Sequence, residues 1–302
     1  MALKVRTGNF EDFSLLVEWS AEEFDWELVP DDFHVHKDST KGDWFLVAED
    51  ENGQCVGCIT AMVHGVRDGY IGCFFVRKDK RNSGIGKILF EKALKMLEGK
   101  NIGLAAEPHM SDIYLRKGFT AVSDYGIVIA DGCISPKSLD KKLSISGIVL
   151  EEISAWVLER VIQYDFGVLG RSRSQKLSQY LIHHPHVISL VACDSQTKTV
   201  IGYGAIKNVA GKRLIVGPIF ANTEAIAKMI MLGLLSKYKK DLTKYRIRVF
   251  ALVKDKANPS NVIVNSFGLN IMCTISRMFT CEVPTIDAER MFCLEDNEVT
   301  IG

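Results

Sequence analysis

A pair of glycines between a strand-like segment and a helix-like segment constrains this chain more than any other feature. Residues 70–76 are apolar and predict a strand, while residues 84–98 carry apolar side chains at helical spacing. Between them the sequence reads Arg81-Asn82-Ser83-Gly84-Ile85-Gly86. The first turn of a helix has N–H groups without partners and a partial positive charge, and glycine lets the backbone approach a ligand closely. The segment therefore predicts a phosphate-binding loop.

Two familiar phosphate-binding motifs do not fit this segment. A P-loop needs Ser or Thr after Gly86-Lys87, where this chain has Ile88, and a dinucleotide fingerprint needs a third glycine at Leu89. The pattern that remains, Arg-x-x-Gly-x-Gly after an apolar strand, resembles the acyl-CoA-binding motif of the GNAT acetyltransferase superfamily. A second segment is similar to that family's Tyr-x-x-x-Gly-Phe, namely Tyr114-Leu115-Arg116-Lys117-Gly118-Phe119.

The resemblance implies a mixed α/β fold, α+β-like, with a splayed sheet that has helices on both faces. It implies that acetyl-CoA binds as co-substrate, with its pantetheine arm between strand 70–76 and strand 102–106. The pyrophosphate is expected on the amides of residues 82–87, with Arg81 over the outer side of the anion, and the thioester carbonyl near the amide of Phe75. The expected cofactor-binding residues are Phe74, Phe75, Val76, Arg81, Asn82, Ser83, Gly84, Ile85, Gly86 and Lys87.

The resemblance also suggests catalytic residues. Tyr114 lies where the family places a general acid for the departing thiolate, although an ordinary buried aromatic would satisfy the same pattern. Seven residues earlier this chain has Glu107, where related enzymes often have Asn. Glu107 is expected to act as a base, directly or through water, or else to be an exposed structural carboxylate. His109 is the alternative base, since its ordinary pKa suits the task.

Acidic and aromatic residues gather on the first predicted helix and the loop after it, a region that covers the acceptor site in the resembled fold. Together such groups attract and hold a cationic amine, so we expect Glu23, Phe24 and Trp26 to bind the substrate. The alternative is that solubilising charges flank a buried aromatic face. The acidic residues of this run are Glu22, Glu23, Asp25, Glu27, Asp31 and Asp32.

The second half repeats the order of elements of the first, which predicts two copies of one fold, residues 1–140 and 141–302. Where the first copy has its glycine pair, the second has residues 215–222 with Pro218, so a second acyl-CoA is not expected. This half resembles the degenerate C-terminal domain of YitH-type acetyltransferases. It is expected to close one side of the acceptor pocket or to be purely structural. Asp165 and Arg173 reach that pocket or pair with each other.

Composition excludes several other classes. The 37 basic residues balance the 37 acidic ones, which argues against a nucleic-acid partner. No apolar run spans a membrane, and the first residues lack a signal-peptide core, so a cytoplasmic location is expected. The eight cysteines are expected to be mostly buried reduced thiols, and no metal site is expected. His183-His184-Pro185-His186 is expected to be a surface loop.

We therefore expect an N-acetyltransferase that moves acetyl from acetyl-CoA to a small amine by direct attack in a ternary complex. The alternative is an acyl-CoA-binding regulator with little turnover. A protein-lysine acetyltransferase fits less well, because the second domain would crowd a peptide groove. The oligomeric state stays open.

Overall fold

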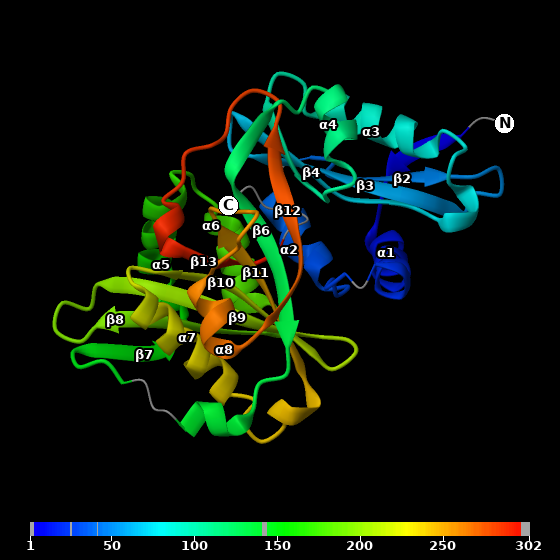
Figure 1. The fold of residues 1–302 in the computed structure, drawn as a ribbon. Helices are drawn as coiled ribbons and strands as arrows, with labels where there is room; N and C mark the ends of the chain where they lie inside the picture. Colours follow the sequence, from blue (N-terminus) through cyan, green and yellow to red (C-terminus); the bar gives the residue numbers. More distant parts are fainter. Residues whose placement is uncertain (1–2, 25, 41, 141–143, 297–302) are drawn as a thin grey trace.

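The computed structural model describes residues 3–24, 26–40, 42–140 and 144–296, and Figure 1 shows its fold. Its first half alternates strands and helices. The strands are β1 (Lys4–Thr7), β2 (Phe45–Glu49), β3 (Cys55–His64), β4 (Asp68–Val76), β5 (Asn101–Ala106) and β6 (Ala121–Gly132). The helices are α1 (Phe10–Glu23), α2 (Asp32–Ser39), α3 (Ile85–Met96) and α4 (Ser111–Arg116), with short 3-10 turns at Lys78–Lys80 and Pro136–Asp140.

The second half follows the same plan. Its strands are β7 (Ile148–Glu152), β8 (Val187–Asp194), β9 (Val200–Val209), β10 (Arg213–Ala221), β11 (Arg246–Val253), β12 (Asn270–Phe279) and β13 (Met291–Leu294). Its helices are α5 (Ala155–Leu169), α6 (Ser174–Ser178), α7 (Glu224–Ser236) and α8 (Val262–Phe267). Single turns lie at Gln179–His183, Leu242–Lys244 and Ala288–Arg290.

The described strands form one continuous mixed sheet in which the two halves exchange strands. The order is β1-β2-β3-β4-β5-β12-β6-β11-β13-β10-β9-β8-β7. Strand β12 of the second half lies between β5 and β6 of the first, and β6 in turn pairs with β11. Figure 1 shows β6 and β12 side by side where the halves meet. Each half therefore completes the sheet of the other.

Helices cover both faces of the sheet, as predicted. In the first half, Leu89 and Ala93 of α3 pack on one face, while Phe13 and Leu16 of α1 pack on the other. In the second half, α7 and α5 are divided between the faces in the same way. Burial of these apolar stripes holds the layers together, because each fully buried large side chain contributes about 1.5–3 kcal/mol.

The sequence predicts Asn9 as the cap of the first helix and Asn222 or Thr223 as the cap of the helix that follows them, and the structure confirms Asn9 on α1 and Thr223 on α7. Two other predictions differ from the structure. The sequence predicts two strand-like pieces over residues 119–130, whereas residues 121–132 form the single strand β6, and the loop expected after the first helix contains α2. Strands β1, β7 and β13 had no sequence signal, since four or five residues show too little alternation. The boundary expected near residue 140 lies beside residues 141–143, which are outside the described residues, and stays a prediction.

Candidate functional site

The loop between β4 and α3 presents backbone amides. Gly84 precedes the helix in the left-handed region, with φ +88°, a conformation that glycine adopts without a steric cost. Within this fully described loop, no side chain caps the helix at Gly84. The N–H groups of Ile85, Gly86 and Lys87 stand in the first turn, where a helix has no internal acceptors. The geometry fits an anion such as a pyrophosphate.

Beside this loop, β4 and β5 diverge. Their parallel pairing covers residues 68–70 and 101–103 and ends there over the described strands. Beyond that point lies a cavity of about 460 Å³, lined by Ile71, Gly72 and Phe74 of β4 and by Leu104 and Ala105 of β5. Where two paired strands separate, their backbone N–H and C=O groups can pair with an extended ligand instead. The cleft is therefore suited to a long, amide-containing arm.

Tyr114 of α4 lines the same cavity. Its ring packs against Phe90, with ring centroids 5.8 Å apart, and against Phe119 at 6.0 Å. Glu107 and His109 line the cavity as well, and the Glu107 carboxylate lies 3.3 Å from Nδ1 of His109. Both side chains are largely exposed, at 58% and 72%. The Tyr114 phenol and the Glu107–His109 pair thus line the same cavity.

The remaining predicted cofactor residues lie around the loop in different roles. Phe74 turns into the cavity, and its ring would contact a methyl group placed on Gly86 at 3.2 Å. Phe75 turns to the opposite face, where it stacks on Trp19 at 5.7 Å. Asn82 has φ +62°, and the Ser83 hydroxyl donates to the carbonyl of Lys80 at 2.5 Å.

Arg81 is engaged within the protein. Its Nε donates to the Val76 carbonyl at 2.9 Å, and its guanidinium pairs with Glu23. The same group lies over the rings of Phe24 and Phe75, 5.5 and 5.8 Å from their centroids. In this conformation the charge of Arg81 is therefore balanced by Glu23 rather than directed over the loop.

Two of the three residues predicted to bind the substrate line the cavity. Phe24 and Trp26 stack on each other at 5.7 Å and line the cavity. Glu23 pairs with Arg81 instead and does not appear among the lining residues described. Glu27 takes its place in the wall. Asp25, another member of the acidic run, lies outside the described residues.

The second half supplies the far wall of the cavity. Cys273 and Ile275 come from β12, and Arg248 comes from β11. Arg248 is buried, pairs with Glu27 and donates to Asp131 at 3.1 Å. Sequence analysis missed these residues. The strand exchange brings these residues to the cavity, and no local sequence pattern indicates that exchange.

The corresponding cleft of the second half is filled by the chain itself. Strands β10 and β11 pair in parallel over residues 213–215 and 246–248 and then diverge, as β4 and β5 do. Strand β13 fits between them, with Cys293 opposite both Ile219 and Ala251. The four residues of β13 are all buried. A second acyl-CoA has no room in this conformation.

Other predictions of side-chain environment had mixed outcomes. Asp165 and Arg173 pair with each other at 2.8 Å. The histidine tract is not simply a surface loop, because His184 is buried against Asp32. All eight cysteines are free thiols, and all but Cys133, Cys273 and Cys281 are buried.

Two features are absent from the part of the chain that the structure describes. No group of three or more His, Cys, Asp or Glu side chains is placed to hold a metal ion. None of the helices in this part of the chain has both the length and the apolar composition that crossing a bilayer requires.

Comparison with known proteins agrees with this architecture. Two family models described as acetyltransferase (GNAT) domain match the chain, one over residues 17–132 and the other over residues 161–293. No curated protein matches the sequence significantly.

Solved structures share the fold at low identity. A Pyrococcus horikoshii protein provisionally classed as an acetyltransferase is 18% identical, with a TM-score of 0.71 and 99% and 96% of the two chains covered. A tandem GNAT protein of the clavulanic acid biosynthesis pathway is 13% identical, with a TM-score of 0.66 and 92% and 98% covered. Saccharomyces cerevisiae N-myristoyltransferase, crystallised with myristoyl-CoA, is 9% identical, with a TM-score of 0.60 and 99% and 85% covered.

Proposed function

Since the chain belongs to the GNAT acetyltransferase family and carries two such domains in tandem, we propose that it transfers acetyl from acetyl-CoA to the amine of a small molecule. The family implies acyl transfer from acyl-CoA. The observation that carries the finer proposal is the cavity of about 460 Å³ that begins at the divergence of β4 and β5 and includes Tyr114 and Glu107 in its wall.

The first half is proposed to bind the co-substrate. Amides of Ile85, Gly86 and Lys87 hold the pyrophosphate, and the open edges of β4 and β5 pair with the pantetheine arm. The second half offers a template for this pairing, because β13 lies between β10 and β11 in the same way. When the parallel pair β4–β5 is aligned with the parallel pair β10–β11, Phe74 and Phe75 fall at the positions of Ile219 and Phe220. Both of those residues pair with β13. One acyl-CoA per chain is therefore proposed.

The proposed chemistry is direct attack by the amine. Glu107, held by His109, accepts a proton from the ammonium group, and the neutral nitrogen forms a bond to the thioester carbon. A backbone N–H near Phe75 donates to the carbonyl oxygen as it gains negative charge. The carbon–sulfur bond then breaks, Tyr114 donates a proton to the sulfur, and the nitrogen releases its second proton, which restores the Tyr114 hydroxyl. The products are an amide and CoA.

The state of Cys273 supports direct attack over a cysteine-linked intermediate. This thiol lies in the cavity wall, and burial, followed by the Glu107 carboxylate, raises its pKa above the usual range. A thiol with a raised pKa stays protonated at neutral pH and is a poor nucleophile.

The cavity favours a compact amine with an apolar body. Trp26, Ile275 and Met272 supply apolar surface, while the second half closes the side along which an extended peptide would run. Among its acidic lining residues, Glu27 is neutralised by Arg248, which leaves Glu107 to attract a cation. This combination supports a small amine over a protein lysine.

A thiol-release assay with acetyl-CoA and a panel of aliphatic, aromatic and polyamine acceptors tests the proposal. We expect amine-dependent release of CoA, formation of the acetylated amine by mass spectrometry, and a calorimetric stoichiometry of about one CoA per chain. Tight CoA binding without turnover for any amine would instead indicate an acyl-CoA-binding regulator. Absence of CoA binding would overturn the proposal altogether.

A further inference from the structure

The segment between α1 and α2 forms one wall of the acceptor end of the cavity. Trp26 and Glu27 lie in that wall, and α2 begins at Asp32. Trp26 and Leu28 of this segment pack on the first half, whereas its buried carboxylates are held from the second half. Two of its carboxylates, Glu27 and Asp32, are bound there by basic side chains.

The first contact joins Glu27 to the strands of the second half. Its carboxylate pairs with Arg248 of β11 and lies 3.7 Å from Arg213 of β10. Arg248 in turn donates to Asp131 at 3.1 Å. The Glu27 and Arg248 side chains are each 10% exposed, so water screens this pair weakly. The guanidinium group therefore fixes the carboxylate at one place in the wall.

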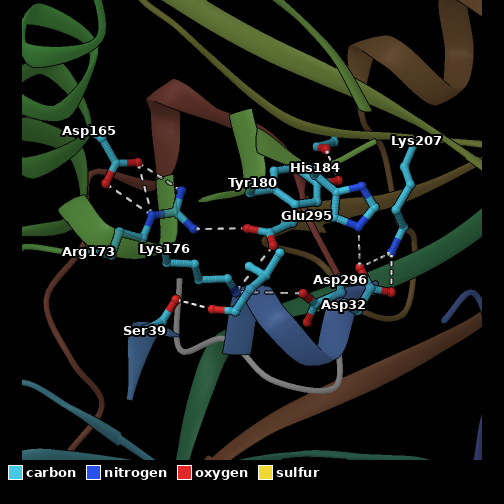
Figure 2. A network of polar contacts seen from close by, with 12 residues as sticks. Asp32, Ser39, Asp165, Arg173, Lys176, Tyr180, His184, Lys207, Glu295 and Asp296 are labelled. Carbon is cyan, nitrogen blue, oxygen red and sulfur yellow. Dashed lines mark hydrogen bonds and ion pairs between the residues drawn. The ribbon is translucent and has the colours of Figure 1, made fainter. Parts of the chain in front are cut away.

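The second contact joins Asp32 to Lys207 of β9. The ammonium group lies 2.9 and 3.1 Å from the two carboxylate oxygens, and His184 lies 3.1 Å from one of them. The side chains of Asp32 and Lys207 are 5% and 6% exposed. Figure 2 shows Lys207 and His184 converging on Asp32 at the start of α2.

Asp32 also shapes its own segment. One of its oxygens accepts the backbone N–H of Val29 at 2.8 Å, which closes the turn before α2. Burial disfavours the charged carboxylate, but Lys207 and His184 outweigh that effect and hold the pKa of Asp32 below its usual range. The Asp32 carboxylate is thus charged at neutral pH, and its contact with Lys207 ties the turn to β9.

The two contacts lie next to each other. Glu27, Asp32 and Lys207 all line a single small cavity of about 20 Å³, whereas Lys207 does not line the large one. A displacement of Asp32 is therefore transmitted over a few residues to Glu27 and Trp26. Within the described residues, no hydrogen bond or ion pair joins Lys207 to β4, β5 or α3.

We propose that Lys207 is a positioning residue: through Asp32 it holds residues 26–32 so that Trp26 and Glu27 keep the acceptor pocket in shape. This inference rests on the proposed amine acetylation at the large cavity. In this proposal the second half shapes the pocket that recognises the acceptor, and the first half binds acyl-CoA.

Replacing Lys207 by Met keeps the length of the side chain and removes its charge. We expect the KM for the acceptor to rise about tenfold, because small displacements of a positioning wall have large effects, while the KM for acetyl-CoA changes less than about twofold. Lys237→Met is the control, because it removes an ion pair with Glu152 of β7 in which both residues belong to the second half. We expect it to leave the acceptor KM within about twofold of the unmodified chain.

A lone buried carboxylate is costly, so Lys207→Met alone can unfold the chain. The double variant Asp32→Asn/Lys207→Met removes both charges and preserves shape. It should fold and show the same rise in acceptor KM. A folded double variant with an unchanged acceptor KM would overturn the inference.

Hydrogen exchange gives a second readout that needs no substrate. Peptides covering residues 26–39 should exchange faster in the Lys207 variants than in Lys237→Met, with α3 unchanged. Equal exchange in all of them overturns the inference. If the unmodified chain acetylates no amine, the proposed function fails, and the exchange experiment still decides whether Lys207 holds the segment.

Discussion

Gly217 of β10 lies directly against the backbone of Leu294 of β13, so closely that a methyl group on Gly217 would overlap the Leu294 carbonyl. This contact is possible only for glycine, and it lets β13 enter the cleft between β10 and β11. Asn261 holds the same strand, since its side-chain amide donates to the Phe292 carbonyl at 2.9 Å. The second domain thus keeps the divergent strands of a GNAT fold while its own chain fills them.

Gly217→Ala should destabilise the protein strongly. The added methyl group must displace backbone rather than a flexible side chain, and we expect the free energy of unfolding to fall by about 2–4 kcal/mol. Chemical denaturation measures this change. Gly167→Ala is the control, because its helical site in α5 has open space around the new methyl group, and it should be neutral or slightly stabilising. Equal stability of the two variants would contradict the described position of β13.

Gly84→Ala should weaken acetyl-CoA binding. Alanine at φ +88° is strained by about 1–2 kcal/mol, and relaxation of the backbone turns the amides of the first turn of α3 away from the pyrophosphate. We expect about a tenfold weaker Kd by calorimetry. Gly211→Ala, at φ +74° in the turn before β10, carries the same strain far from the loop. It should lower the melting temperature to a similar extent and leave the Kd unchanged.

Tyr114→Phe should separate chemistry from binding. Loss of a general acid lowers kcat by about 100-fold or more, whereas the aromatic packing on Phe90 and Phe119 is retained. Calorimetry should give a CoA affinity within about twofold of the unmodified chain. Tyr238→Phe, in the second half against Tyr245, serves as control and should keep full activity. Full turnover in Tyr114→Phe would exclude the tyrosine as the acid.

His36 should make stability depend on pH. Burial, aided by Lys176, lowers the pKa of His36 from 6.5 to about 4. Between these values the unfolded chain binds a proton that the folded chain does not, so stability falls as pH decreases from 6.5 to 4. The contribution reaches about 3 kcal/mol at pH 4. The stabilising effect of Asp32, whose pKa in the folded chain is lowered from 3.8, is lost only as the pH falls below that value.

Urea denaturation at several pH values between 4.5 and 7 measures this dependence. His36→Gln removes the titrating group and should flatten the curve over that range. An unchanged slope in His36→Gln would assign the dependence to other groups.

The site was predictable in part because some of its signals are local. The left-handed glycine at 84, the uncapped start of α3 and the short helix with Tyr114 depend on neighbours within a few residues. Glycine conformation, helix periodicity and capping act over that range. Family membership and the fold class follow from these local patterns and their order, as the matches to the two domain models confirm.

The role of the acidic run at residues 22–32 could not be predicted from local sequence patterns. As a sequence it indicates either an attraction for cations or a solvated surface. In the structure Glu23 pairs with Arg81, Glu27 with Arg248, and Asp32 with Lys207. The partners of Glu27 and Asp32 lie 221 and 175 residues away along the chain. No spacing within the run indicates which basic residues will lie opposite.

By itself the sequence determined the glycine-containing loop before α3, the two copies of the fold, and some residues that line the cavity, such as Phe74, Glu107 and Tyr114. Only the tertiary structure decided that β12 completes the sheet of the other half, that β13 fills the second cleft, and that Arg248 and Lys207 pair with Glu27 and Asp32. The physical reason is that strand pairing and buried ion pairs depend on which distant surfaces meet. A four-residue strand or a single lysine carries no pattern that specifies its partner.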